Sequence, residues 1–242
     1  MSNLTNKKYD GRYDRHAFNS KNPLARFAHR SRYKVSLDLI KNINNIRLLD
    51  FGCGDGRLLH HLTPKHHDSS FIGFEPYHKE QISEQISIFK DWDDILKDTQ
   101  ENGLFDYVVC FEVLEHLNLE NQEEIFNRVS QVLKKEGTFI VSVPIEKGLP
   151  SVVKNLRRLI IHYNAEIYSF KNIVASLFGY KTKWMKNHRE QSDYLSHIGF
   201  YFNELETYFK GEFTITKRKF SPFRFLGYQL NSQVFYSLKL KL

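Results

Sequence analysis

Short apolar runs alternate along the chain with longer segments whose apolar residues recur every three or four positions. The short runs predict buried β-strands, and the recurring positions predict amphipathic helices. Strands are expected over 48–51, 71–74, 86–89, 105–111, 137–144, 213–220 and 233–240. Helices are expected directly after residue 56 and over 23–43, 119–134, 150–161, 165–178 and 203–209, the last capped by Asn203. Because strands and helices alternate over most of the chain, the pattern predicts an α/β fold.

The first strand runs into a turn with three alternating glycines within 52–56. Glycines let the backbone turn sharply and remove the side chains that would hold a ligand at a distance. A dinucleotide-binding turn, G-x-G-x-x-G, would need its third glycine at position 57, where the chain has Arg57. Asp50, two residues before the first glycine, would repel a pyrophosphate and attract an ammonium group. The turn therefore favours a cofactor that carries an amino-acid ammonium over NAD.

Residues 46–144 resemble the class I S-adenosylmethionine-dependent methyltransferases, whose first motif is an acidic residue followed by G-x-G-x-G. The second strand ends in Glu75, the third is followed by Asp91-Trp92, and the fourth continues into Glu-Val-Leu-Glu-His over 112–116. That continuation is common in the branch that methylates quinone precursors, sugars and other small metabolites. Five elements in the right order make the resemblance specific, whereas a single glycine turn would be weak.

The resemblance implies a Rossmann-like fold with a seven-stranded, mostly parallel sheet, an antiparallel last strand, helices on both faces and a helical insertion after the fifth strand. It also implies S-adenosylmethionine as the cofactor. Asp50 would bind the ammonium group, Glu75 would accept bonds from both ribose hydroxyls, and Phe111 would lie near the methyl group. Further cofactor contacts are expected at the turn, after the ribose-binding acid and beside the adenine, from Gly52, Cys53, Gly54, Pro76, Asp91 and Trp92.

A length of 242 residues is consistent with one methyltransferase domain. Within it we expect an N-terminal helical cap, a cofactor-binding core, a basic helical insertion or lid, and a C-terminal helix with the last strands, over 1–45, 46–144, 145–200 and 201–242. The first residues lack the apolar stretch of a signal peptide, and no apolar window reaches the length of a membrane span. We therefore expect the protein in the cytoplasm.

The net charge of +7 is unevenly distributed. Residues 48–144 hold 18 acidic and 8 basic side chains, whereas 1–47 hold 3 acidic and 11 basic ones and 145–200 hold 4 acidic and 9 basic ones. If the two basic segments flank the mouth of the site, they favour an anionic substrate. A solvated basic surface without a partner is the alternative.

The segment 150–161 predicts an amphipathic helix with Lys154, Arg157 and Arg158 beside its apolar residues. Such a helix can lie on a membrane surface, close over a site as a lid, or bury its apolar face in the domain. The pattern leaves these alternatives open. A lipid-linked substrate and peripheral contact with the inner membrane face are therefore among the expectations.

Two histidines are candidates for the general base that a hydroxyl acceptor would need, because imidazole titrates in the useful range. His116 follows the fourth strand and is equally consistent with a packing role. His197 lies after the insertion, in a His-Ile-Gly-Phe segment similar to the substrate-side turn of sugar and polysaccharide-cluster methyltransferases, and ranks first. Cys53 and Cys110 lie in apolar strand contexts, which predicts buried, inert thiols. No cysteine–histidine cluster has the spacing of a metal site.

The favoured function is methyl transfer to a hydroxyl, or less readily an amine, of a small or lipid-linked, anionic metabolite such as a sugar or glycan intermediate. An RNA methyltransferase is an alternative because the chain is basic. However, enzymes that methylate exocyclic base amines carry (Asp/Asn/Ser)-Pro-Pro-(Tyr/Phe) where this chain has Cys-Phe-Glu-Val over 110–113, so nucleic acid is a less favoured partner. A catalytically silent protein that keeps the cofactor fold is a third possibility, against which the intact glycine turn and its acidic residues argue. The oligomeric state stays open.

Overall fold

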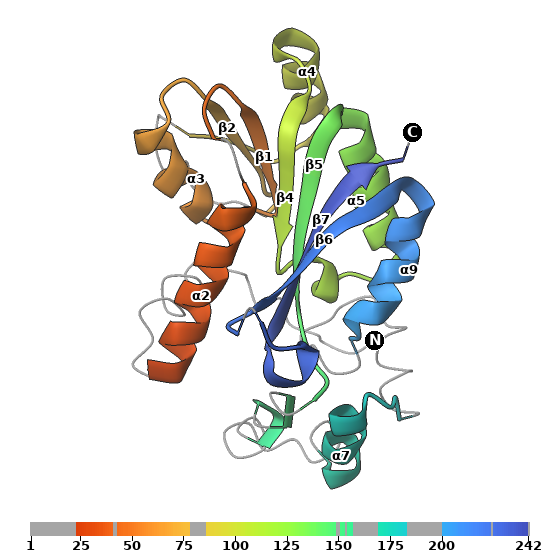
Figure 1. Cartoon of the computed structure of the whole chain (residues 1–242). Coiled ribbons are helices and arrows are strands. Elements are labelled where there is room, and N and C mark those ends of the chain that lie inside the picture. Colours follow the sequence, from red (N-terminus) through yellow and green to blue (C-terminus); the bar gives the residue numbers. More distant parts are fainter. Residues whose placement is uncertain are drawn as a thin grey trace.

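The computed structural model describes residues 23–40, 43–77, 86–148, 151–152, 154–156, 169–182, 200–223 and 225–241. Seven strands form one sheet in the order β3-β2-β1-β4-β5-β7-β6 (Figure 1). Their bounds are β1 Arg47–Phe51, β2 Ser70–Phe74, β3 Ser87–Phe89, β4 Phe105–Phe111, β5 Leu133–Pro144, β6 Phe213–Ser221 and β7 Gln233–Leu240. The sheet is the one that the apolar pattern predicts.

The strands from β1 to β5 are parallel to one another, and β7 is antiparallel to both of its neighbours, β5 and β6. β7 therefore runs against the other six strands, which confirms the predicted mostly parallel sheet with an antiparallel last strand. The carboxyl ends of β1, β2 and β4 meet at one edge of the sheet, the edge at which ligands bind in open α/β folds.

Helices cover both faces of the sheet, as predicted (Figure 1). On one face lie α2 (Pro23–Leu39) and α3 (Arg57–Leu62), and on the other lie α4 (Trp92–Asn102), α5 (Leu119–Val132) and α9 (Phe202–Glu212). Side chains alternate between two apolar cores along β4, where Val108 belongs to the α5 side and Val109 to the α2 side. Both cores are dry and apolar because a parallel sheet buries both of its faces.

Two boundaries differ from the predicted ones. α5 ends at Val132 and β5 begins at Leu133, although the pattern placed the helix end at 134 and the strand start at 137. The early start of β5 includes an irregularity between Leu133 and Thr138. Gly137 makes this possible, because a Cβ at this position would lie only 2.7 Å from the carbonyl oxygen of Lys134. Asn203 does not cap α9, which begins one residue earlier; its side-chain oxygen instead accepts a hydrogen bond of 3.0 Å from Lys147.

Part of the insertion between β5 and α9 is described. Residues 151–152 and 154–156 are helical, within the predicted helix over 150–161, and α7 (Phe170–Phe178) falls within the predicted helix over 165–178. Ser169 caps α7 by accepting a hydrogen bond from the backbone of Asn172. Arg157, Arg158 and His197 lie outside the described residues. Within the described part of the chain, no helix has the length and apolarity needed to cross a membrane.

Candidate functional site

The glycine turn joins β1 to α3 at the carboxyl edge of the sheet. Gly52 and Gly56 have φ angles of +76° and +68°, a conformation that side chains with a Cβ rarely adopt. A Cβ on Gly52 would also lie only 2.5 Å from Cγ2 of Val113, so this position has no room for a side chain. The backbone N–H groups of Gly52 and Cys53 donate to the carbonyl oxygen of Phe74 at 2.8 and 3.3 Å. These bonds fix the turn against the end of β2.

Glu75 follows β2 and lies against the same turn. One carboxylate oxygen accepts a hydrogen bond of 3.1 Å from the backbone N–H of Gly54, and the other accepts one of 3.2 Å from the backbone N–H of Tyr77. The residue is only 9% exposed. Because an ionised carboxylate has about four acceptor positions, each oxygen can still accept a second hydrogen bond. Glu75 is thus held in one orientation and keeps the capacity to bind two hydroxyl groups.

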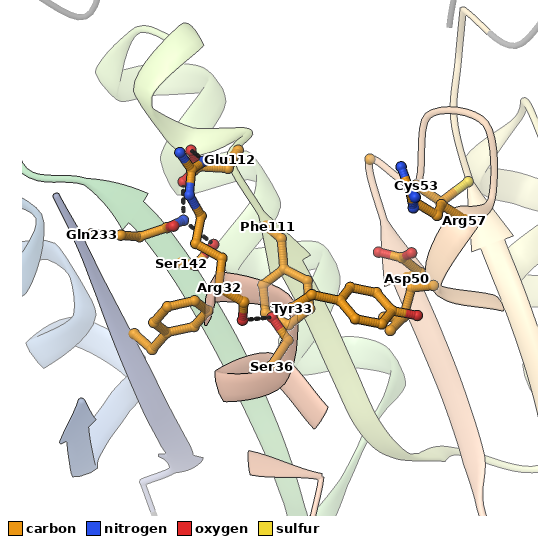
Figure 2. Close-up of a pocket in the computed structure, with 13 residues that line it drawn as sticks. Arg32, Tyr33, Ser36, Asp50, Cys53, Arg57, Phe111, Glu112, Ser142 and Gln233 are labelled. Atoms are coloured by element: carbon orange, nitrogen blue, oxygen red, sulfur yellow. Dashed lines mark hydrogen bonds and ion pairs between the residues drawn. The ribbon is translucent and has the colours of Figure 1, made fainter. Parts of the chain in front are cut away.

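A pocket opens between the turn, α2 and the ends of three further strands (Figure 2). Asp50, Gly52, Cys53 and Phe111 all line it, so the structure brings these four predicted positions together. Its remaining lining residues are Arg32, Tyr33, Ser36, Arg57, Leu58, Glu112, Ser142, Gln233 and Phe235. Asp50 is 5% exposed and presents a carboxylate to the pocket.

An aromatic side and an acidic side face each other in this pocket. The rings of Phe111 and Phe235 make an edge-to-face contact with centroids 6.2 Å apart, which forms an apolar wall. Tyr33 extends from α2 toward Asp50 (Figure 2). Burial raises the pKa of Tyr33 well above its usual value, Arg57 partly counteracts this effect, and Asp50 adds to it. The Tyr33 phenol is therefore neutral and able to donate a hydrogen bond at neutral pH.

A polar network closes the other end of the pocket (Figure 2). Arg32 of α2 donates to one carboxylate oxygen of Glu112 at 3.0 Å, and Gln233 of β7 donates to the other oxygen and, at 3.0 Å, to the hydroxyl of Ser142. Glu112 directly follows β4 and has a φ angle of +58°. A non-glycine residue in this conformation is uncommon and typical of functional sites.

Sequence reasoning missed this network and Tyr33. Glu112 belongs to the Glu-Val-Leu-Glu-His segment that carries the resemblance, so the motif could have pointed to it. Nothing local distinguishes Arg32 or Gln233, because their role arises only when α2 and β7 meet at the end of β4.

The remaining predicted cofactor positions do not line the pocket. The ring of Trp92 packs on Phe51 and Phe74, with centroids 5.6 and 5.3 Å apart, in the core on the α4 and α5 face. A large apolar ring is better accommodated between two phenylalanines than at an open edge. The adenine contact of Trp92 stays a prediction. Asp91 precedes α4, and Pro76 is exposed directly after Glu75.

Of the two predicted histidines, only His116 is among the described residues. His116 lies in a short 3-10 helix, Leu114–His116, with its side chain 44% exposed and its Nε2 3.9 Å from a carboxylate oxygen of Glu115. It does not line the pocket, and both the catalytic and the packing role stay predictions. His197 is outside the described residues, so its role stays a prediction.

Cys53 and Cys110 are buried, free thiols, as predicted. Burial raises the pKa of both, and the nearby carboxylates add to this effect, so neither thiol is a nucleophile at neutral pH. Among the residues that the structure describes, no group of three or more acidic, histidine or cysteine side chains is arranged to hold a metal ion.

Comparisons with known proteins agree with this geometry. The profile of a family described as "Methyltransferase domain" matches residues 19–203. Cyclopropane-fatty-acyl-phospholipid synthase of Escherichia coli K12 is 28% identical over 116 residues, which cover 47% of this chain and 30% of that protein. The chain therefore spans about a third of the length of this curated relative.

Solved structures share the fold at low sequence identity. PH0226 protein from Pyrococcus horikoshii OT3 is 16% identical, with a TM-score of 0.52 over 93% of this chain and 95% of that one. Magnesium protoporphyrin IX methyltransferase (ChlM) from Synechocystis PCC 6803, solved with bound SAH, is 13% identical, with a TM-score of 0.51 over 94% of this chain and 92% of that one. PKMT2 from Rickettsia typhi is 17% identical, with a TM-score of 0.52 over 83% of this chain and 50% of that one. These similarities extend over nearly all of the sheet and its helices.

Proposed function

Because the chain belongs to the methyltransferase domain family, we propose that it transfers a methyl group from S-adenosylmethionine to an acceptor bound in the pocket. The observation that carries this proposal is the combination of the glycine turn with two buried acids, Asp50 and Glu75, at one edge of the sheet. We further propose that the acceptor atom is a hydroxyl oxygen, or less readily an amine, of a small or lipid-linked metabolite with negative charge, such as a sugar or glycan intermediate.

The residues present fit this cofactor. Gly52 lines the pocket without a side chain, so a ligand can approach its backbone there, and its packing against Val113 fixes the turn. Asp50 can pair with the ammonium group of the cofactor, and Glu75 has acceptor positions left for the two ribose hydroxyls. The bound cofactor would supply an electrophilic methyl group on a sulfonium.

The chain's own contribution to the reaction is alignment and exclusion of water. The Phe111 and Phe235 rings would form an apolar wall that excludes water from the acceptor. In-line displacement also requires that donor and acceptor be held at near-contact distance. A hydroxyl acceptor must also lose its proton. We propose His197 for this role, with His116 as the second candidate, since imidazole is the side chain best matched to neutral pH.

The chemistry of the acceptor is inferred from charge and from one relative. Arg57 lines the pocket and would favour an anionic acceptor, whereas the charge of Arg32 is paired with Glu112. The name of the E. coli relative includes a fatty-acyl phospholipid, which supports a lipid-linked acceptor for this chain. The protein would then act in the cytoplasm, at the inner membrane face when its acceptor is lipid-linked. Of the bases predicted to contact a membrane from the segment 150–161, Lys154 bonds to the buried carboxylate of Glu146 at 3.1 Å, so this contact would depend on other residues.

The proposal is tested by incubating the protein with S-adenosylmethionine and a panel of hydroxylated, anionic and lipid-linked metabolites while the release of S-adenosylhomocysteine is measured. Release that depends on one acceptor class supports the proposal and names the class. Tight binding of S-adenosylhomocysteine without turnover on any acceptor would instead indicate a silent cofactor-binding protein. Tighter binding of NAD than of S-adenosylhomocysteine would overturn the cofactor assignment.

A further inference from the structure

The connection between β6 and β7 presents large apolar side chains to solvent. Phe225 is completely exposed, and the exposed fractions of its neighbours Phe223, Leu226, Tyr228 and Leu230 lie between 37% and 47%. Single exposed apolar residues are ordinary on protein surfaces. Five exposed apolar side chains within residues 223–230 are an unusual concentration, and such surfaces mark interaction sites.

The described residues of this connection, 222–223 and 225–232, form a rigid loop. Asn231 is fully buried, and its amide oxygen accepts a hydrogen bond of 2.7 Å from the backbone N–H of Phe223. Its amide nitrogen lies 2.7 to 2.9 Å from three carbonyl oxygens of the loop, those of Phe223, Leu226 and Gly227. A buried polar side chain bonded to four backbone atoms fixes the loop conformation. The apolar side chains therefore point outward as part of the folded structure and do not result from a frayed segment.

Two helices near the loop also expose large apolar side chains. Phe27 of α2 is half exposed and its ring lies 6.3 Å from that of Phe223. On the other side, the Lys147 ammonium lies 4.3 Å from the ring of Tyr228, and the next residue bonds to the carbonyl oxygen of Ser176 in α7. α7 and the loop lie at the same end of the molecule (Figure 1). α7 itself exposes a large apolar side chain, Phe170, which is 81% exposed.

This surface adjoins the pocket. Asn231, which holds the loop, is two residues from Gln233, which lines the pocket and donates to Glu112. Ser31, directly before Arg32 on α2, is 3.1 Å from the hydroxyl of Ser221 at the start of the loop. Whatever binds the loop therefore lies next to the mouth of the pocket.

The charge around the loop identifies its partner. Residues 213–242 contain six Lys or Arg residues and no Asp or Glu. Lys217 and Lys219 lie on β6 shortly before the loop, whereas Arg218 between them is paired with Glu206 at 2.6 Å. Lys239 and Lys241 lie at the far end of β7. An aromatic and aliphatic tip with basic residues behind it fits the interface of an anionic bilayer, where apolar groups enter the headgroup region and bases pair with phosphates. A second copy of this chain would bring two positive surfaces together, which disfavours self-association.

We propose that the loop over 222–230 docks the protein on an anionic phospholipid bilayer, with the pocket mouth facing the membrane. The proposal rests on the proposed function in one respect, since a lipid-linked acceptor could then enter the pocket directly from the bilayer. Docking itself requires no methyl transfer, so the two are measured separately.

The test is flotation of the full chain with vesicles of phosphatidylcholine and phosphatidylglycerol in a 3:1 ratio, and with vesicles of phosphatidylcholine alone. The wild-type protein is expected to bind the anionic vesicles, with binding that weakens as salt rises. The double variant Phe225→Ser/Leu226→Ser is expected to bind at least about tenfold more weakly, because both side chains leave water on docking. Leu104→Ser is the matched control, since Leu104 is 39% exposed but precedes β4 at the opposite edge of the sheet.

S-adenosylhomocysteine binding by the same variants separates this proposal from the proposed function. The loop variant should bind S-adenosylhomocysteine as tightly as the wild type does. Loss of vesicle binding by this variant, with intact S-adenosylhomocysteine binding and an unchanged melting temperature, supports docking. Equal vesicle binding by the wild type and the loop variant overturns the proposal, as does equal binding to both lipid compositions. A wild-type dimer that the loop variant abolishes, without vesicle binding by either, would assign the loop to a second copy.

Discussion

Arg32 and Glu112 lie 80 residues apart in the chain and form an ion pair with 3.0 Å between Nη1 and Oε2. The pair connects the N-terminal helix α2 to the residue with left-handed backbone at the end of β4. One helix thus brings both Arg32 and Tyr33 into the pocket, and it is tied there to an acid of the Glu-Val-Leu-Glu-His segment.

Replacing Arg32 by Met should therefore affect ligand binding more than stability. Both side chains are about 30% exposed, so loss of the pair should cost at most about 1 kcal/mol of unfolding free energy. S-adenosylhomocysteine affinity should fall more than tenfold if α2 closes the pocket. Urea denaturation and calorimetry give the two quantities, and Lys97→Met, which removes the exposed pair with Asp94, is the control. A loss confined to stability would show that α2 is only a structural cover.

Asp50→Ala and Glu75→Ala should each weaken S-adenosylhomocysteine binding by roughly 1.5–3 kcal/mol, the value of a hydrogen bond to a charged group. Asp50 loses the partner of the ammonium, and Glu75 loses the acceptor of the ribose hydroxyls. Calorimetry checks both, with Asp94→Ala on the surface of α4 as the control. Unchanged affinity in both variants would contradict the proposed orientation of the cofactor.

Gly52→Ala should abolish measurable ligand binding, because its Cβ would approach Val113 to 2.5 Å at a φ angle of +76°. The double variant Gly52→Ala/Val113→Ala removes the close contact and leaves only the backbone strain, so it should recover part of the affinity. Gly103→Ala is the matched control: its φ angle is +90°, but nothing lies within 4 Å of the added Cβ. If the double variant binds no better than Gly52→Ala, backbone strain rather than crowding is the limiting factor.

His197→Ala should lower kcat by about 10²–10⁴, the usual contribution of a general base, while S-adenosylhomocysteine affinity stays near that of the wild type. Its pH–rate profile should lose the acidic limb near the histidine pKa. His116→Ala should retain turnover, because its exposed side chain lies outside the pocket lining. The reverse pattern would transfer the role to His116, and two active variants would show that alignment suffices.

Glu115 should make the protein less stable as the pH rises. Burial, reinforced by Glu112, raises the pKa of the fully buried Glu115 carboxyl well above its ordinary value of about 4.3. Above that value the folded state retains a proton that the unfolded state has lost, so this contribution to stability is complete below the unfolded pKa and declines as the pH increases. Urea denaturation from pH 4.5 to 8 should show Glu115→Gln gaining stability relative to the wild type with increasing pH. Parallel curves for the two proteins would contradict the raised pKa.

The sheet could be predicted almost completely from sequence, because each strand is a short apolar run and its neighbours are specified by the βαβ pattern. The part of the site formed by the β1–α3 turn was equally readable, since Asp50 and the glycines are adjacent in the chain. The contact of Trp92 with the adenine stays a prediction, because proximity to an acid in the sequence says nothing about which face of the sheet a ring enters. Arg32, Tyr33 and Gln233 were missed because they come from opposite ends of the chain and meet only through tertiary packing.

The position of β7 between β5 and β6 determines when the site is completed during synthesis. β7 is the last strand in the sequence, yet it supplies Gln233 and Phe235 to the pocket and shields the edge of β5. A nascent chain that has left the ribosome only as far as β6 already contains the turn and its acids, but it lacks one wall of the pocket. Ligand affinity is therefore a readout of completed folding, and a partly synthesised chain would compete poorly for the cofactor.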